Sequence, residues 1–443
     1  MKKVAVIGAG FTGLASAVEL VNKGFQVSIF EASDQAGGLA GGFYPPMNSS
    51  WKWKLESYYH HVFTNDADII RLAKMVGSPV LIKKPITNSF VLNQEIQMDS
   101  PISLLRFSGI SLFSRLRMGV GLALLKMIPN GLFLERYRVM DSLPLLLGKE
   151  GYQVVWEKLL RAKFGPYIDQ VNLAWFWGRV SKRTKNLGYF EGGFAGLVEK
   201  IVEYIEKKGG RVVLGTEIAT VRSTEIRNDE DGGTRDDPAD SFAVRRAGGG
   251  VLVDGERFDA VVLTTPAESI NKIVEGVDFP RLDYLWGQTL ILETSQKLLQ
   301  GYWLNILEDD WPFLVMVDQA NFIDKKYYGG SHLVYLGNYL PEGHKQLKMS
   351  KEELLSLYDP FIKKVNKYFS KKKIKNLFLF RSPYAQPVFP VNYAQKNPEM
   401  RSPVEGVYLA NMSMVYPYDR GTNYAVKMGV EVARMIINDL NNK

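Results

Sequence analysis

The chain contains no cysteine among its 443 residues. This absence excludes a disulfide framework, a zinc–thiolate site, an iron–sulfur cluster, a cysteine nucleophile and a redox-active dithiol. Histidine is also scarce, because only His60, His61, His332 and His344 occur. We therefore expect no metal site. The stretch 228–240 is rich in Asp and Gly, but it has no regular ligand spacing and is typical of a solvated hairpin loop.

Long apolar runs are missing too. The longest, Gly119 to Leu134, is interrupted by Lys126 and Pro129, and it falls short of the roughly 18 uncharged residues that a membrane span requires. The N-terminus superficially resembles a signal peptide, with basic residues before an apolar run. Glycines and a helical pattern follow instead of a small-residue cleavage site, so we expect a cytoplasmic protein.

The composition is that of an ordinary globular protein, with 46% hydrophobic and 23% charged residues. The length predicts roughly three domain-sized units or two larger ones. Lys and Arg number 55 against 47 Asp and Glu, a net charge of +8. This excess suits an anionic ligand or an anionic membrane surface. Nucleic-acid binding is not expected, because the basic residues are scattered and no recognition motif accompanies them.

The first residues follow a strand, glycine turn, helix, strand pattern. A β-branched run at 4–7 predicts a buried strand, and Gly8, Gly10 and Gly13 then form a GxGxxG motif. These glycines permit a tight turn, close approach of a pyrophosphate, and close packing of helix on strand. The helix N-terminus, which includes Phe11 and Thr12, would offer amide groups to the phosphates.

The second predicted strand, 25–30, ends at Glu31. A carboxylate at this point would accept hydrogen bonds from the adenosine ribose hydroxyls and would repel a 2′-phosphate. The pattern therefore favours FAD or NAD over NADP. Gly37 and Gly38 follow where a simple NAD domain would begin another helix, which favours FAD.

These two glycine motifs resemble those of the large FAD-dependent superfamily that contains amine oxidases, protoporphyrinogen oxidase, phytoene desaturases and UDP-galactopyranose mutase. The resemblance implies that the chain around Ala32, Gly37, Gly38 and Leu39 contacts FAD. One departure from the superfamily is Gln35-Ala36, which stands where a basic residue is common. A side-chain contact to phosphate from that position is therefore not expected.

Two central segments extend the resemblance. The turn at 188–194, the helix after it and the strand that returns near 211–221 are similar to the desaturase and protoporphyrinogen-oxidase pattern. This similarity implies that the Ile218 backbone contacts the adenine. The run 261–266, which includes Thr265, resembles the strand that ends beside the adenosine half of the cofactor.

The C-terminal segment resembles the flavin end of the same superfamily. A strand is predicted at 407–410, and Asn411-Met412 follows where many members carry Gly-Asp or Gly-Glu. The resemblance places both residues near the ribityl chain. It also directs the helix that begins near Gly421, Thr422 and Asn423 at the flavin pyrimidine ring. Amide groups at a helix start can stabilise the negative charge that reduced flavin develops at N1 and O2.

Aromatic and imidazole side chains gather at 56–63, where related flavoproteins pass the isoalloxazine ring. The catalytic candidates are His61, His60 and Tyr59, and Tyr58 is a candidate for substrate contact. Adjacent residues of a strand point to opposite faces, so we expect at most one histidine to face the flavin and prefer His61. The alternative is that each is a structural, hydrogen-bonded histidine.

Helical periodicity dominates from about 90 to 187. Residues 102–134 contain basic but no acidic side chains. Two interpretations remain open, a basic amphipathic segment on an anionic bilayer and a helical cap packed on its own domain. The cluster at 175–177, followed by Arg179, Lys182, Arg183 and Lys185, fits either this surface or the wall of an apolar substrate cavity.

Strands predicted at 290–294, 314–317 and 333–336 would form a second sheet, the usual floor of the substrate domain in this superfamily. Candidate polar groups on that floor are Asn321, Tyr335, Asn338 and Tyr339. Each of them could equally be a sheet residue that faces water.

We therefore predict an α/β protein, with a Rossmann-like FAD-binding domain of the glutathione-reductase type built from 1–85, 188–280 and 376–443. An interleaved α+β substrate domain would comprise a helical cap at 86–187 and a sheet-containing part at 281–375. The predicted function is hydride transfer from a C–H or C–N centre of a small apolar or anionic substrate to N5 of non-covalently bound FAD. The alternatives are a non-redox nucleotide-sugar mutase and a cofactor-binding module without chemistry.

Overall fold

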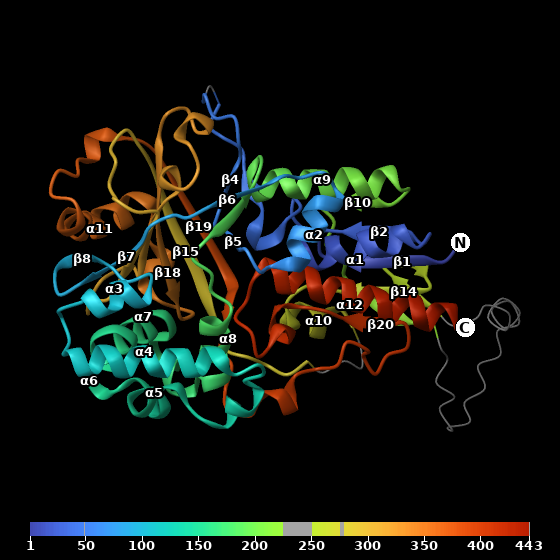
Figure 1. Ribbon diagram of the computed structural model, residues 1–443. Coiled ribbons are helices and arrows are strands. Elements are labelled where there is room, and N and C mark those ends of the chain that lie inside the picture. Colours follow the sequence, from blue (N-terminus) through green and yellow to red (C-terminus); the bar gives the residue numbers. More distant parts are fainter. Residues whose placement is uncertain (48, 225–249, 275–278, 443) are drawn as a thin grey trace, which may run out of the picture.

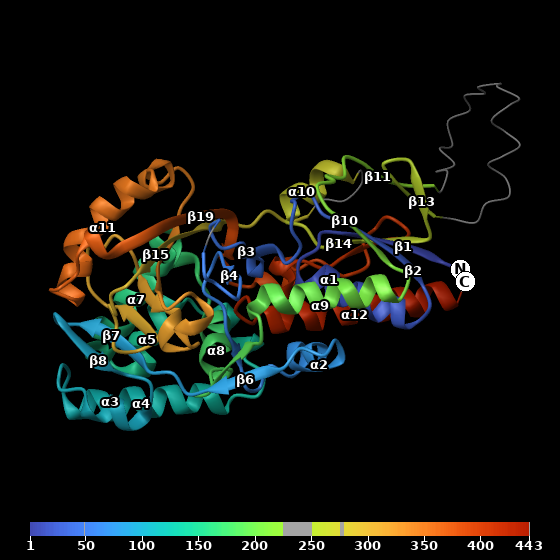
Figure 2. The same cartoon turned by 90° about the horizontal axis from the view of Figure 1, so that it is seen from above.

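The computed structural model describes residues 1–47, 49–224, 250–274 and 279–442. The chain forms two halves that lie side by side (Figures 1 and 2). One half holds a parallel sheet with helices packed on it, and the other holds a larger sheet, also flanked by helices. The Asp- and Gly-rich stretch 228–240 lies outside the described residues.

The parallel sheet has five strands in the order β10-β2-β1-β14-β20. Their bounds are β1 Lys3–Ile7, β2 Gln26–Phe30, β10 Arg211–Val213, β14 Ala260–Leu263 and β20 Val407–Leu409. All four neighbouring pairs are parallel, so the predicted strands here are confirmed. The carboxyl ends of β1, β2 and β14 lie together, which is where ligands bind in open α/β sheets.

Three long helices accompany this sheet: α1 (Phe11–Asn22), α9 (Gly193–Lys207) and α12 (Thr422–Asn441). Both α9 and α12 contact α1. Gly429 permits the close approach of α12, because a Cβ at this position would lie 2.3 Å from the Thr12 carbonyl oxygen and 3.0 Å from the Ala15 Cβ.

Substitution of Gly429 by Ala is therefore expected to lower the free energy of unfolding by about 1–3 kcal/mol, the usual cost of overpacking. Gly119 provides a matched control inside another helix, because a Cβ there meets no atom within 4 Å. Gly119→Ala should leave stability unchanged or raise it by up to about 1 kcal/mol. Urea denaturation of both variants measures the difference. Equal stability of the two would contradict close helix packing at Gly429.

The second sheet has seven strands in the order β19-β15-β18-β17-β16-β7-β8. Their bounds are β7 Thr87–Val91, β8 Gln94–Gln97, β15 Tyr284–Thr294, β16 Trp303–Ile306, β17 Val315–Asp318, β18 His332–Leu340 and β19 Ile374–Pro387. Helix α11 (Lys351–Val365) packs against β15 and β19. The three strands predicted from 290 to 336 are confirmed within β15, β17 and β18.

Two of the predicted domain boundaries disagree with the strands that make up this sheet. β7 and β8 fall in the segment assigned to the helical cap, yet β7 pairs with β16. Most of β19 falls in the segment assigned to the cofactor domain, yet it pairs with β15 along almost its full length. Both corrections have the same cause, because long-range pairing decides which sheet a strand joins.

The cap contains α3 (Pro101–Arg106), α4 (Leu112–Met127), α5 (Val139–Leu147), α7 (Lys158–Phe164) and α8 (Leu173–Ser181). Its core includes Phe107, Leu143 and Phe164. Trp175, Phe176 and Trp177 also lie in this core, so assigning these three to an exposed surface is wrong. No helix that the structure describes is long and apolar enough to cross a membrane.

The remaining elements are short. They are β3 Gly42–Phe43, β4 Leu55–Glu56, β5 Val62–Phe63, α2 Ala67–Met75, β6 Val80–Lys83, α6 Lys149–Gly151, β9 Leu187–Phe190, β11 Val221–Ser223, β12 Val251–Val253, β13 Glu256–Phe258 and α10 Ala267–Ile273. Among them α6 packs in the cap, and β11, β12 and β13 form a small sheet beside the parallel sheet. Strands β4 and β5 flank residues 57–61, and this position brings that irregular segment to the junction.

Candidate active site

A cavity of about 770 Å³ runs between the two halves. It is lined at one end by the turn after β1 and at the other by cap helices and the second sheet. The predicted site residues that line it are Gly8, Gly10, Phe11, Thr12, Glu31, Gly37, Gly38, Leu39, Tyr58, Tyr59, His60, His61, Thr265, Tyr339, Asn411, Met412, Gly421, Thr422 and Asn423. Gly13, Ala32 and Ile218 do not line it.

The GxGxxG turn has the geometry that its spacing predicts. Gly8 has a φ of +102°, and a Cβ there would lie 2.6 Å from Thr264 Oγ1. A Cβ on Gly13 would lie 2.0 Å from the Gly8 carbonyl oxygen, so this glycine serves close packing rather than ligand contact. At Gly10 a Cβ meets nothing within 4 Å, because the backbone faces the cavity. No side chain caps α1, so its first amides remain available to phosphate.

Glu31 is held in a fixed orientation beside this turn. Its Oε2 accepts a hydrogen bond of 2.7 Å from the Ala9 amide. Its Oε1 accepts bonds from the amide and the hydroxyl of Ser33 at 3.0 and 2.8 Å. A carboxylate has about four acceptor sites, so one is left for a ligand hydroxyl.

Two buried polar atoms at the cavity lack partners among the described residues: Thr265 Oγ1 and Asn411 Nδ2. The Asn411 Oδ1 accepts bonds from the amide and hydroxyl of Ser413, which fixes the side-chain amide. Buried polar groups are normally satisfied, so both atoms indicate that a polar ligand belongs here. Together with the open helix start and Glu31, these residues fit a dinucleotide cofactor.

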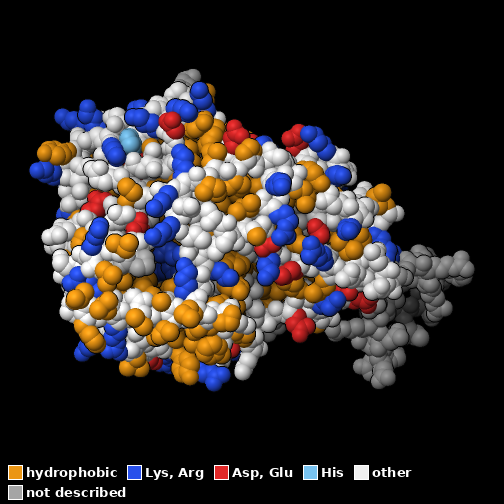
Figure 3. Space-filling view, in the orientation of Figure 1, with side chains coloured by type: hydrophobic (Ala, Val, Ile, Leu, Met, Phe, Trp, Pro, Cys, Tyr) orange, Lys and Arg blue, Asp and Glu red, His pale blue; other side chains and the backbone are white. Residues whose placement is uncertain are grey.

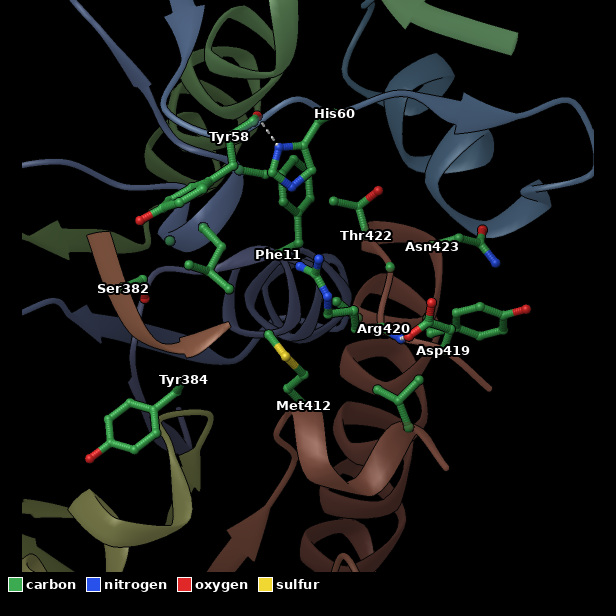
Figure 4. A pocket seen from close by; sticks show the side chains of 18 of the residues that line it. Phe11, Tyr58, His60, Ser382, Tyr384, Met412, Asp419, Arg420, Thr422 and Asn423 are labelled. Carbon is green, nitrogen blue, oxygen red and sulfur yellow. Dashed lines mark hydrogen bonds between the residues drawn. The ribbon is translucent and has the colours of Figure 1, made fainter. Parts of the chain in front are cut away.

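The start of α12 also opens on the cavity. No side chain caps its N-terminus at Gly421 (Figure 4). The Asn423 side chain is used elsewhere, because its Oδ1 accepts bonds from the amides of Asp68 and Ile69 at 2.9 and 3.1 Å. The Asn423 side-chain oxygen is therefore already used, whereas the backbone amides of Thr422 and Asn423 remain to act on a ligand.

The two histidines both line the cavity, whereas at most one of them was expected to face it. The reason is that residues 57–61 form no strand. His60 Nδ1 lies 2.6 Å from the Tyr58 carbonyl oxygen (Figure 4). A carbonyl can only accept, so this nitrogen carries the proton. Burial lowers the pKa of His60 to about 4. Its neutral ring therefore keeps a lone pair on Nε2.

His61 has a different environment. Its Nδ1 lies 3.3 Å from the Tyr302 hydroxyl, and its ring packs edge to face against Trp303. Burial lowers the pKa of His61 to about 3. Burial also raises the pKa of Tyr59 to about 12, so its hydroxyl stays protonated. The sequence preference for His61 has no support in these contacts, and His60 has the better-defined acceptor.

Of the residues predicted to contact substrate, some line a cavity and others do not. Tyr58 and Tyr339 line the main cavity, whereas Asn338 lines only a smaller adjoining pocket of about 30 Å³. Asn321 does not reach either one, because its amide donates to the Leu299 and Gly301 carbonyls. Tyr335 is buried and donates to the Glu56 carbonyl. Both are structural, so their assignment to substrate contact is corrected.

The cavity wall carries charged side chains, of which only some were predicted from the sequence. Arg179, Lys182 and Arg183 line the cavity, so the wall that was expected to be apolar carries positive charge. Lys163, Asp419 and Arg420 line it as well and were not predicted. One signal was available, because Asp419-Arg420 directly precedes the predicted C-terminal helix.

The comparisons with known proteins agree with this geometry. The profile of the family described as "Flavin containing amine oxidoreductase" matches residues 11–437. A zeta-carotene desaturase from Zea mays is 29% identical over 159 residues, which cover 32% of this chain and 27% of that protein. A 1-hydroxycarotenoid 3,4-desaturase from a Flavobacterium species is 58% identical over 38 residues, 9% of this chain and 8% of that protein. The chain thus matches only about a quarter of the first relative's length.

Solved structures resemble the whole chain. A putative protoporphyrinogen oxidase from an Exiguobacterium species has a TM-score of 0.73 at 15% identity, covering 99% of both chains. A reduced UDP-galactopyranose mutase has a TM-score of 0.71 at 14% identity, covering 99% of this chain and 96% of that one. These likenesses establish the α/β fold. The profile match over nearly the full length means that the chain belongs to the flavin containing amine oxidoreductase family.

Proposed function

We propose that this protein binds FAD without a covalent link and oxidises a small-molecule substrate at a C–H or C–N centre. When bound, FAD supplies the redox chemistry by accepting a hydride at N5. The observation that carries the proposal is one continuous cavity that joins the glycine turn after β1 to the second sheet and the cap. We infer that the parallel sheet forms the cofactor domain and that the other half forms the substrate domain.

The chain's own residues would divide the work of binding. The α1 amides and Gly10 would hold the phosphates, and Glu31 the ribose. Thr265 and Asn411 would satisfy their free polar atoms on the cofactor. The Thr422 and Asn423 amides at the start of α12 would stabilise negative charge on the reduced ring.

On the substrate side, His60 Nε2 is the best-defined acceptor for a proton or a hydrogen bond. Its pKa of about 4 keeps it neutral near pH 7. Tyr58 and Tyr59 line the same part of the cavity and stay protonated, because burial raises the pKa of both. We therefore assign binding and orientation to these three side chains and leave the redox step to the cofactor.

Anaerobic mixing tests the function. The purified protein should be yellow, and its flavin absorbance near the visible maximum should bleach when a substrate from a screen of amines, polyenes and porphyrinogens is added without oxygen. Acid precipitation should release the colour to the supernatant if FAD is bound without a covalent link; attachment through cysteine is excluded because the chain has none. A colourless protein that FAD cannot reconstitute would contradict the proposal. Colour left in the precipitate would contradict non-covalent binding.

A second candidate is a non-redox mutase that acts on an anionic nucleotide sugar. The basic residues on the cavity wall favour it, because they would match a diphosphate. Turnover of such a sugar by the reduced protein, with no net electron acceptor, would select the mutase. Substrate-dependent bleaching selects the oxidoreductase.

We also propose that the cap rests on an anionic membrane surface. Six apolar side chains of α4 are between 51% and 78% exposed, namely Leu112, Phe113, Leu116, Val120, Leu124 and Met127. At about 100° per residue they form a stripe roughly 120° wide. Arg117 borders one side and Lys126 the other. Figure 3 places hydrophobic side chains together over the region of α4.

The exposed apolar stripe of α4 with its basic rim is better suited to contact with a lipid surface than to contact with water. Monomeric proteins rarely expose contiguous apolar patches of this kind, and basic residues at the rim would contact anionic head groups. The buried face of α4, with Ser114, Met118, Gly121 and Leu125, packs on the cap. The two sequence interpretations are therefore compatible, since one face of α4 can pack while the other binds lipid.

The triple variant Phe113→Gln, Val120→Gln, Leu124→Gln should lose at least tenfold in binding to vesicles that contain phosphatidylglycerol. Each removed side chain forfeits about 1.5–3 kcal/mol of apolar burial, and 1.4 kcal/mol is a factor of ten. A matched control replaces exposed apolar residues elsewhere: Met75, Leu214 and Tyr368. Sedimentation at low salt measures binding. A native protein that ignores such vesicles would refute the membrane proposal.

A further inference from the structure

We propose that the substrate side of the cavity contains a subsite for an oxyanion, a carboxylate or phosphate group of the substrate, built by Lys163, Arg179 and Arg420. This inference rests on the proposed function and narrows its substrate class. The three cations come from separate elements, α7, α8 and the loop before α12, and all line the main cavity. Figure 4 shows Asp419 and Arg420 beside Thr422 at the cavity.

One carboxylate, Asp419, organises the cluster. Its Oδ2 lies 2.9 Å from Arg179 Nη1 and 3.9 Å from Lys163 Nζ. Its Oδ1 accepts bonds of 3.0 Å from Trp175 Nε1 and 3.1 Å from the Arg420 amide. The neighbouring Lys163 and Arg179 outweigh burial, so the pKa of Asp419 lies below its usual value and the group is ionised.

Arg420 is not neutralised by this carboxylate. Its guanidinium donates to neutral acceptors, Gln386 Oε1 at 3.0 Å and the Tyr339 hydroxyl. Its Cζ lies 4.9 Å from the centre of the Tyr339 ring, and Lys163 Nζ lies 4.8 Å from the same centre. Two cations therefore share one aromatic ring. The bond from Arg420 uses an oxygen lone pair of Tyr339, so the phenol proton can point to a ligand.

The charges of this cluster do not balance. Three basic side chains surround one carboxylate, so this buried wall holds more basic groups than acidic ones. Lys163 is only 5% exposed. Burial, followed by the neighbouring arginines, lowers the pKa of Lys163 well below its usual value, although Asp419 opposes the shift. Burial lowers the pKa of Arg420 to about 10. Buried cations are costly unless they are paired, so a bound anion would stabilise them.

The cluster belongs to the substrate side rather than to the cofactor phosphates. The proposed phosphate site is the start of α1 at Gly10. Lys163 and Arg179 belong to the cap, and the residues that orient Arg420 belong to β18 and β19 of the second sheet. Figure 3 shows Lys and Arg side chains around a recess in the half that holds the second sheet and the cap.

Titration of the FAD-loaded protein with succinate and with inorganic pyrophosphate tests the subsite at constant ionic strength, by calorimetry and by the flavin difference spectrum. Lys163→Met and Arg420→Gln should each weaken binding at least tenfold. Lys163→Met keeps the Asp419–Arg179 pair and removes a costly buried charge, so it should fold. Lys158→Met is the control, because Lys158 lies on the same helix outside the cavity and pairs with Asp309 at 3.3 Å.

The probe that binds more tightly shows which group of the substrate the subsite takes. Tighter binding of succinate indicates a carboxylate, and tighter binding of pyrophosphate indicates a phosphate. Absence of binding by both probes, or equal binding by the native protein and Lys163→Met, overturns the subsite. FAD occupies the cofactor phosphate site of the loaded protein, so binding of either probe to that form reports on the substrate side. Flavin content is read independently from the spectrum, so failure to hold FAD contradicts the proposed function and not the subsite.

Discussion

Substitution of Glu31 by Gln is expected to raise the Kd for FAD by about ten- to a hundredfold. The carboxylate is held by the Ala9 and Ser33 groups, and its remaining acceptor site would receive a ribose hydroxyl. A hydrogen bond to a charged group contributes about 1.5–3 kcal/mol, and 1.4 kcal/mol corresponds to a factor of ten. The amide has only one acceptor oxygen, so its NH2 group must face either the Ala9 amide or the Ser33 amide, which adds repulsion at the turn.

Equilibrium dialysis of FAD against the flavin-free protein measures this effect. Glu191→Gln is the control, because Glu191 is exposed and does not line the cavity. Its Kd should equal that of the native protein. Unchanged FAD occupancy in Glu31→Gln would remove Glu31 from the ribose role.

Replacement of Glu56 by Gln is expected to change how stability depends on pH. Glu56 is 1% exposed, and its carboxyl accepts bonds of 2.5 Å from the Tyr189 hydroxyl and 2.6 Å from the Phe194 amide. Burial outweighs these bonds and raises the pKa of Glu56 from 4.5 to about 7. Between these values the unfolded chain loses the proton while the folded protein keeps it.

The sign follows from proton linkage. The native protein should lose about 3 kcal/mol of stability from this group as pH rises from 4.5 to 7, since each pKa unit is worth about 1.36 kcal/mol. The amide of Gln has no such titration. Glu56→Gln should therefore gain about 3 kcal/mol relative to the native protein between pH 4.5 and pH 8.

Urea denaturation at the two pH values measures this gain. Glu206→Gln, an exposed position on α9, should show the same pH dependence as the native protein. A stability difference between Glu56→Gln and the native protein that stays constant with pH would mean that Glu56 titrates alike in the folded and unfolded chains.

Local patterns were enough to predict the cofactor turn. The strand, the three glycines, α1 and Glu31 lie within 31 residues, and each constraint acts between near neighbours in the chain. The same holds for the strand and helix at the C-terminus. Hydrophobic periodicity found β15, β17 and β18 for the same reason, but it could not assign β7 or β19 to a sheet.

The histidine pair illustrates a limit of local rules. Alternation across a strand is reliable only where a strand forms, and residues 57–61 form none. Likewise, the sequence showed that basic residues follow Trp177, but it did not show whether their side chains point to solvent or into the cavity. Burial of Trp175 and Trp177 in the cap directs α8 so that Arg179 reaches the cavity.

The sequence by itself determined the α/β class, the dinucleotide turn and the absence of thiol chemistry, because these depend on residue type and short spacing. Only the tertiary structure decided that Lys163 and Arg420 share the ring of Tyr339, and that one stripe of α4 stays exposed. Both depend on packing between segments far apart in the chain. The free energy of such contacts comes from burial and charge in three dimensions, which no local pattern contains.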